Sequence, residues 1–447
     1  SFQVNLRSLK VIKMNVMKIL CIVACLIATA TCSTHTQKQH RGSNSLKPTD
    51  WLSTSKLESL ESLDQITLQQ MENMPVEKSA ELMQHLYHLS QINNDISPSF
   101  VPSANNIPAS IIKPNGENLS TTLNQLVAKA KQQPNFGDEE VTIFITGLPE
   151  QTETISKATQ KLVQAYQQRY NGQQQYQQQQ RNNKNNRNSD ENKAQSSSEE
   201  DYNDSGNQGP KNVIDLGATL STFKRFAMLD VEKTGDMIGK MIVQLTNQAD
   251  VPQEIVHIVA QGIAAHVAGA AGREYTRLTG HKLRRITALD PSRIFAKNPN
   301  TLPGLARGDA EFVDAIHSSA YGMGTPARVG DVDFYPNGPS AAVPGATNLV
   351  EASMRATRYF AESVMPGKER NFPAVAARSI EEYRNNEGYG KRAYMGINTE
   401  YDVEGDYMLE VNAKAPFGKS APAQKQNAYH SMHQPWNKNS RSNSQEN

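Results

Sequence analysis

One short segment of the sequence has the outline of a catalytic turn but lacks the group that would react. Residues 254–272, EIVHIVAQGIAAHVAGAAG, join an apolar run to a tight turn and then to a helix-like stretch of small residues. In a strand–turn–helix of the form G-x-S-x-G, the central serine attacks a carbonyl carbon and small flanking residues permit the sharp turn. Here the centre is Gly262, which tolerates a positive φ but carries no nucleophile. An ordinary buried strand-to-helix turn explains these residues equally well.

The segments around this turn predict an α/β fold. Alternating strand-like and helix-like segments form a mostly parallel sheet with helices on both faces. Residues 93–116 are rich in Pro and Asn and are interpreted as a connector, and residues 388–419 as short strands and turns. Strands are predicted for residues 140–149, 211–217, 255–259, 284–290, 311–318 and 329–338, and helices for residues 57–71, 76–92, 155–170, 231–249, 348–364 and the segment that starts at Ile263.

Composition narrows the classes of partner. The 447 residues include 46 Lys and Arg and 45 Asp and Glu, which gives a net charge of +1. This balance argues against nucleic acid as the main partner, because neutralising phosphates requires a basic excess. The only cysteines are Cys21, Cys25 and Cys32. Since all three lie in or beside the leader described next, we expect no internal disulfide and no metal site built on thiolates. No other metal site and no cofactor is predicted.

An apolar leader near the N-terminus predicts secretion. Residues 14–32 contain Lys18, the apolar run Ile19–Ala28 and small residues suited to cleavage, which is the arrangement of a secretory signal peptide. The run is too short for a stable membrane span, and no other segment of the sequence reaches spanning length. Residues 1–13 do not look like a targeting signal and are interpreted as translated upstream sequence.

Five ordered blocks of sequence resemble the neutral, pancreatic-type lipase family. They are VHIVAQGIAAHVAGAAG, RRITALDPSRIF, FVDAIHSSA, GDVDFYPNG and RATRYFAESV. The resemblance covers roughly residues 141–418 and implies an α/β-hydrolase fold. Within the family, the leader, the few cysteines, the Gln- and Asn-rich insertion and the altered turn resemble the yolk proteins of higher flies.

The resemblance assigns the family's catalytic positions one at a time. The nucleophile corresponds to Gly262, the acid to Asp290 and the histidine to Ser353, while the oxyanion loop corresponds to Gly147 and Leu148. Loss of the nucleophile alone lowers the turnover rate of a serine hydrolase by a factor on the order of a million. The resemblance therefore implies a lipase relative without catalysis. We interpret Asp290 as a structural residue whose carboxylate caps or hydrogen-bonds nearby backbone in the turn before Pro291.

Three histidines were available as replacement bases, and none is favoured for that role. His266 follows Gly262 by four residues, His257 lies in a predicted strand and His317 ends another. The resemblance implies that His266 is structural, and we interpret His257 and His317 as core or loop residues. Ser353 is no general base near neutral pH.

Hydroxyl residues among acids in a polar segment are candidates for modification. Residues 171–210 carry few apolar side chains and are predicted to form a disordered insertion. Sulfation or phosphorylation would add negative charge to it, and a merely solvated loop is the alternative. The candidates are Tyr202 for sulfation, Ser196, Ser197 and Ser198 for phosphorylation, and Asn118 and Asn203 for N-glycosylation.

The predicted organisation places one large domain after a helical arm. After the leader come residues 33–140 as arm and linker, residues 141–419 as the lipase-like domain with its insertion, and residues 420–447 as a polar tail.

The resemblance implies a secreted yolk protein that stores nutrients for the embryo. Such a protein would pass from haemolymph to yolk granules through an endocytic receptor of the oocyte and lie there beside other yolk polypeptides. A dedicated carrier is a second hypothesis, because an apolar trough beside the turn could hold a lipid or a steroid ester unless side chains fill it. An active esterase with a different nucleophile is the third.

Overall fold

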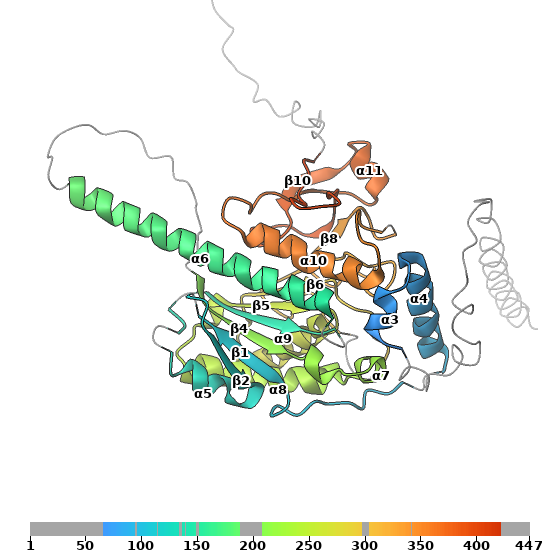
Figure 1. Ribbon diagram of the computed structural model, residues 1–447, viewed down its shortest axis with the longest axis horizontal. Coiled ribbons are helices and arrows are strands. Elements are labelled where there is room, and N and C mark those ends of the chain that lie inside the picture. Colours follow the sequence, from blue (N-terminus) through green and yellow to red (C-terminus); the bar gives the residue numbers. More distant parts are fainter. Residues whose placement is uncertain are drawn as a thin grey trace, which may run out of the picture. The chain divides into compact units, whose positions relative to one another are not determined.

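A single sheet organises the part of the chain that the structure describes (Figure 1). The computed structural model describes residues 66–93, 96–113, 115–133, 136–138, 140–148, 152–187, 208–296, 304–340 and 342–421. The strands in this part are β1 (Pro108–Ile112), β2 (Asn118–Thr122), β3 (Glu140–Thr146), β4 (Gln208–Asp215), β5 (Val256–Gln261), β6 (Arg285–Leu289), β7 (Phe312–Ile316), β8 (Val332–Pro336), β9 (Pro373–Ala376), β10 (Tyr389–Tyr394) and β11 (Gly405–Leu409). Their order in the sheet is β10-β9-β11-β8-β7-β6-β5-β3-β4-β1-β2.

The centre of the sheet is parallel. From β4 through β3, β5, β6, β7 and β8 to β11, every neighbouring pair of strands runs parallel. The strands β1, β2, β9 and β10 add antiparallel pairs at the two sides. Strands β5 to β8 are buried along their whole length, as parallel strands covered on both faces must be. The predicted α/β-hydrolase fold class and its mostly parallel sheet are confirmed.

The helices form one layer on each face of the sheet. They are α3 (Leu68–Glu72), α4 (Val76–Asn93), α5 (Leu126–Ala130), α6 (Glu153–Arg187), α7 (Phe223–Ala227), α8 (Val231–Gln248), α9 (Ala264–Thr279), α10 (Leu349–Val364) and α11 (Ile380–Arg384). Helices α6 and α10 lie side by side, and α8 packs along α9 (Figure 1). Side chains of β5 alternate between the two faces, since Val259 belongs to the same apolar cluster as Phe360 of α10, whereas Ile258 belongs to the cluster that contains Ile242 of α8.

The predicted N-terminal helices dock on the large domain. The α4 residues Leu82, Met83 and Leu86 are fully buried in the same apolar cluster as the sheet, and both α3 and α4 contact α10. The helix predicted for residues 76–92 is therefore confirmed. Of the helix predicted for residues 57–71, only residues 66–71 are described, and α3 accounts for the last of them.

The predicted connector, residues 93–116, contains strand β1 of the sheet, and β2 begins just after it, so its interpretation as a connector is wrong. Strand β1 pairs with both β2 and β4, and α5 follows β2. Pro108 is tolerated because it is the first residue of its strand. The alternating burial of Ala109 and Ile111 supplies the apolar face. The sheet therefore begins before residue 141, the predicted start of the domain.

The disordered insertion predicted for residues 171–210 is also wrong at both ends, because regular structure covers its first and last residues. The backbone of residues 171–187 continues α6, and β4 begins at Gln208. Because Gln and Arg are good helix formers, a helix anchored by its packed first half can propagate into a polar sequence. Residues 188–207, which include Ser196, Ser197, Ser198, Tyr202 and Asn203, lie outside the described residues, as do residues 1–65 with the leader and residues 422–447 of the tail.

Candidate functional site

The turn between β5 and α9 has the predicted strand–turn–helix geometry. Gly262 adopts φ +60, and its amide donates to the Leu289 carbonyl at 3.0 Å. A Cβ at this position would lie 2.8 Å from Cδ2 of Leu148. A left-handed backbone and a close neighbour therefore both favour glycine here.

The segment equated with the oxyanion loop lies directly against this turn. A Cβ on Gly147 would lie 2.3 Å from the amide nitrogen of Ala264 and 2.4 Å from the carbonyl oxygen of Gln261. The next residue, Leu148, is 1% exposed and occupies the space in front of Gly262. The two predicted parts of the site are thus in contact, and the Leu148 side chain packs directly against the turn.

Asp290 follows β6 and is the centre of a buried hydrogen-bond cluster. Its Oδ1 accepts from the backbone amides of Ser318 and Ser319 at 3.0 and 2.7 Å. Its Oδ2 accepts from the Ser319 and Ser353 hydroxyls, both at 2.5 Å. Burial raises the pKa of Asp290 despite these hydrogen bonds. The backbone partners lie in the chain after β7 rather than in the turn before Pro291, which corrects the local hydrogen bonding expected from the sequence.

The acid position and the histidine position are therefore in direct contact. Ser353 lies on the buried side of α10 and links this helix to Asp290. One residue before the turn, Gln261 donates to the Thr357 hydroxyl on the same helix at 2.9 Å. The fold thus brings the elements of Gly262, Asp290 and Ser353 together, and a serine at position 353 can donate to the carboxylate but cannot take a proton from a nucleophile.

Ser292 is a hydroxyl near the turn that sequence reasoning missed. Its buried Oγ has no hydrogen-bond partner within the described structure and lies 3.2 Å from the place of a Cβ on Gly262. The nearby His266 cannot activate it, because its Nε2 contacts the Ser292 carbonyl at 2.7 Å while its Nδ1 accepts from the Leu305 amide at 3.0 Å. Burial lowers the pKa of His266 to about 4. The one feature of the sequence that could have identified Ser292 is its position two residues after Asp290.

The other two histidines are also held in hydrogen-bonded sites away from the turn. His257 lies within β5 and its Nε2 is 2.8 Å from the Thr287 hydroxyl. His317 follows β7, and its nitrogens lie 2.9 Å from the Thr325 carbonyl and 2.7 Å from the Asp333 carboxylate.

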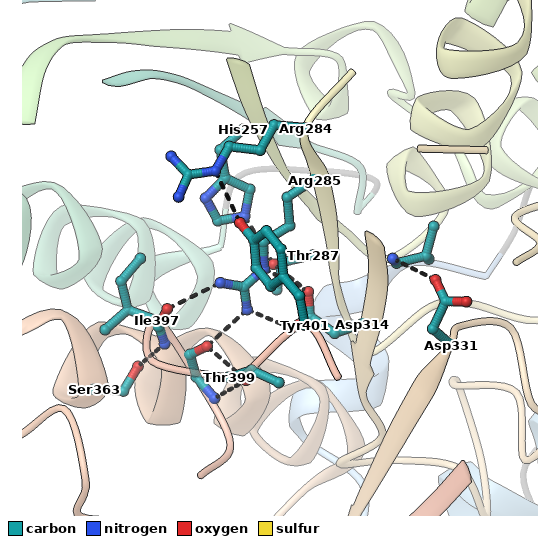
Figure 2. A network of polar contacts seen from close by, with 12 residues as sticks. His257, Arg284, Arg285, Thr287, Asp314, Asp331, Ser363, Ile397, Thr399 and Tyr401 are labelled. Carbon is teal, nitrogen blue, oxygen red and sulfur yellow. Dashed lines mark hydrogen bonds and ion pairs between the residues drawn. The ribbon is translucent and has the colours of Figure 1, made fainter. Parts of the chain in front are cut away.

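A second polar cluster occupies the opposite end of the central strands (Figure 2). Arg285 begins β6 and forms two hydrogen bonds of 2.8 Å to Asp314 of β7. The same guanidinium donates to the carbonyls of Gly396 and Ile397 at 2.8 and 2.9 Å. Although burial opposes the charged form, the Asp314 carboxylate raises the pKa of Arg285. With its donors directed at protein acceptors, this cluster joins strands and loop rather than offering a free site.

Of the predicted modification sites, only Asn118 lies among the described residues. Asn118 is exposed at the start of β2, so a glycan there would meet solvent. Within the described ranges, no group of three or more His, Cys, Asp or Glu side chains converges as metal ligands would. The helices of the described part were also searched for membrane spans, and none combines the necessary length and apolarity.

Comparison with known proteins agrees with this geometry. A family model described as Lipase matches residues 119–417. The chain is 61% identical to Vitellogenin-1 of Ceratitis capitata over 95% of this chain and 98% of that protein. It is 53% identical to Vitellogenin-3 of Drosophila melanogaster over 92% and 98% of the two chains. Pancreatic triacylglycerol lipase of Cavia porcellus is 34% identical over 28% of this chain and 27% of its own length. The chain belongs to the lipase family, among the vitellogenins of flies.

Proposed function

We propose that this chain is a secreted yolk protein that stores nutrients and has no lipase activity. The single observation that carries the loss of activity is the turn at Gly262, where Leu148 fills the space in front of a residue without a nucleophile. The contact between Ser353 and Asp290 supports the same conclusion, because a hydroxyl has replaced the base that a serine hydrolase needs. The names of the similar fly proteins support the storage role.

Secretion and uptake complete the proposal. The leader at residues 14–32 supports release from the cell that makes the protein. We propose that the protein then travels in haemolymph and enters the oocyte through an endocytic receptor, to be held in yolk granules with other yolk polypeptides. Storage requires only a stable, digestible chain, so it is compatible with a hydrolase scaffold that no longer turns over ester.

The test of this function combines location with reactivity. We expect the protein to be abundant in female haemolymph and in egg yolk of the animal that makes it, measured by quantitative immunoblot. We also expect the protein purified from eggs to remain unlabelled by a fluorophosphonate probe that labels pancreatic lipase under the same conditions. Absence from eggs would refute storage, whatever the result of the labelling.

A control variant locates the source of any labelling. Ser292→Ala removes the buried hydroxyl beside Gly262 without touching the hydrogen bond that the Ser292 carbonyl makes with His266. Labelling of the native chain that disappears in this variant would identify Ser292 as a nucleophile and overturn the loss of activity. Labelling that persists in the variant would place a reactive group elsewhere and overturn it as well.

An ester carrier with its ligand beside the turn is not the function that we propose. Leu148 is 1% exposed and lies against Gly262, so an apolar side chain of the protein already occupies space beside the turn. An apolar ligand beside the turn would have to displace this packed side chain.

A further inference from the structure

A separate cavity lies behind the turn. It has a volume of about 920 Å³ and is bounded by α4, the start of α8, the chain after β6 and the segment after β7. Sites for small molecules commonly enclose about 300–1,000 Å³ and have mostly apolar walls with a few polar groups. Aromatic and aliphatic side chains such as Tyr87, Ile294 and Phe295 form part of the wall, and the rings of Tyr87 and Phe295 meet edge to face at 5.9 Å.

Arg293 brings a positive charge to this wall. Its side chain is partly buried, and its Nε and one terminal nitrogen donate to the carbonyls of Gly322 and Ala320 at 2.9 and 3.2 Å. The guanidinium also lies 5.1 Å from the centre of the Tyr87 ring. The Arg293 guanidinium thus contacts neutral carbonyls and an aromatic ring. In the described part of the chain, no carboxylate forms an ion pair with Arg293. Burial lowers the pKa of Arg293, as is usual for a cation that lacks a counter-charge.

The other charged residues of the wall are already neutralised. Asp230 pairs with Lys233 at 3.0 Å, and Glu232 pairs with Arg273 at 2.7 Å. Arg328 pairs with Asp406 at 2.7 Å on the exposed rim. These pairs leave Arg293 as the uncompensated charge among the wall residues that the structure describes, and a partly buried cation gains stability from a nearby anion.

Ser292 adds a polar group to the same wall. It is 1% exposed, and its Oγ is one of the buried atoms without a partner in the described structure. It also lines the cavity directly beside Arg293 in the sequence. A cavity with apolar walls, a cation held in place by two carbonyls and an unpaired hydroxyl is complementary to a ligand that has one charged end.

We propose that this cavity binds a small amphiphile with an apolar body and a single anionic group, and that Arg293 is the counter-ion of that group. The body of the ligand packs against Tyr87, Ile294 and Phe295, while its anionic group lies beside the Arg293 guanidinium. The site adjoins the turn through Ser292, takes an acid rather than an ester, and does not depend on the storage role.

Fluorescence titration with cis-parinarate, a long-chain carboxylate, and with its methyl ester tests the proposal on the full mature chain. We expect saturable binding of the acid with a stoichiometry near one and weaker binding of the ester. Arg293→Gln removes the charge and leaves a shorter side chain with an amide donor, and it should weaken binding of the acid by about ten-fold or more. The same change should leave binding of the ester within about two-fold. Equal affinity of the native chain for acid and ester would overturn the proposal.

Two further variants keep the test decisive. Arg328 lies on the rim, and Asp406 already neutralises its charge, so Arg328→Gln should not alter binding of the acid. An effect equal to that of Arg293→Gln would indicate only a general attraction of anions and would overturn the specific role of Arg293. Because Arg293 also holds two loop carbonyls, its variant could fold poorly. Ile294→Trp, which fills the cavity and leaves Arg293 in place, should then abolish binding of the acid. Retained binding would place the ligand elsewhere and refute the site.

Competition identifies the kind of anion. Oleate offers a flexible chain with a carboxylate, and pregnenolone sulfate offers a rigid body with a sulfate. Displacement of bound parinarate by either one supports the site and assigns its preference. Displacement by neither would show that the probe binds outside a cavity for amphiphilic anions, which contradicts the proposal.

Discussion

At the scale of single residues, the turn at Gly262 combines two constraints that can be separated by experiment. A positive φ costs any residue with a Cβ about 1–2 kcal/mol, because the left-handed conformation crowds the following carbonyl. At Gly262 a Cβ would in addition overlap Leu148, whereas at Gly280, which has φ +77 at the end of α9, nothing lies within 4 Å of it. The difference between these two glycines therefore reports the crowding in front of the turn.

We predict that Gly262→Ala lowers the free energy of unfolding by about 2–4 kcal/mol, while Gly280→Ala lowers it by about 1–2 kcal/mol. Urea unfolding followed by circular dichroism measures both. Leu148→Ala in the Gly262→Ala background should remove the overlap, so the two changes together should cost less than the sum of their separate costs. Additive costs would mean that Leu148 does not occupy the front of the turn.

Some of these residues could be predicted from sequence and others could not. Gly262, Asp290 and Ser353 stand in recognisable blocks, so their roles follow from order along the chain. Ser292 and Arg293 directly follow one of those blocks but carry no signal of their own. Whether a hydroxyl or a guanidinium finds a partner depends on chain that is distant in sequence, such as the Ala320 and Gly322 carbonyls that hold Arg293.

At the scale of elements, the ion pair of Arg285 and Asp314 joins β6 and β7 to the loop before β11 (Figure 2). Both side chains are almost completely buried, so each depends on the other for compensation of its charge. Removing one member of such a pair typically costs about 3–5 kcal/mol, whereas replacing both with apolar groups can be nearly neutral.

We therefore predict that Arg285→Met destabilises the chain by about 3–5 kcal/mol and that adding Asp314→Leu recovers a large part of this loss. Lys157, which pairs with Glu153 on the surface, provides the control, and Lys157→Met should cause no measurable change. Thermal unfolding monitored by intrinsic fluorescence compares the variants. If the double variant is as unstable as Arg285→Met alone, the loop contacts of Arg285 rather than its charge dominate.

The elements themselves were predicted best where their pattern is continuous. The central strands and α8, α9 and α10 follow from apolar runs and helical periodicity alone. Strand β1 was missed because Pro and Asn flank a core of only a few residues, and β9 because PAVA carries no alternation. The length of α6 was missed because a polar composition predicts disorder, whereas the docked residues Ile155, Ala158 and Leu162 anchor the start of this helix.

At the scale of the whole molecule, buried neutral histidines make the fold sensitive to acid. Burial lowers the pKa values of both His257 and His266, the latter from 6.5 to about 4. In the unfolded chain these histidines therefore become protonated near pH 6.5, whereas in the folded chain they stay neutral until the pH is lower. Because proton uptake then favours the unfolded state, the free energy of unfolding is highest above pH 6.5 and falls as the pH is lowered.

We predict that His266 alone accounts for a loss on the order of 2 kcal/mol in the free energy of unfolding between pH 7.5 and pH 5. Urea titrations at several pH values measure the slope. His266→Gln can still accept from the Leu305 amide and donate to the Ser292 carbonyl, so it should flatten the slope whatever its effect on stability at pH 7.5. His281→Gln, on the exposed chain after α9, should leave the slope unchanged. If His266→Gln does not alter the dependence of the unfolding free energy on pH, other groups determine the acid sensitivity. The buried imidazole would then have no influence on how the stored chain responds when its compartment is acidified.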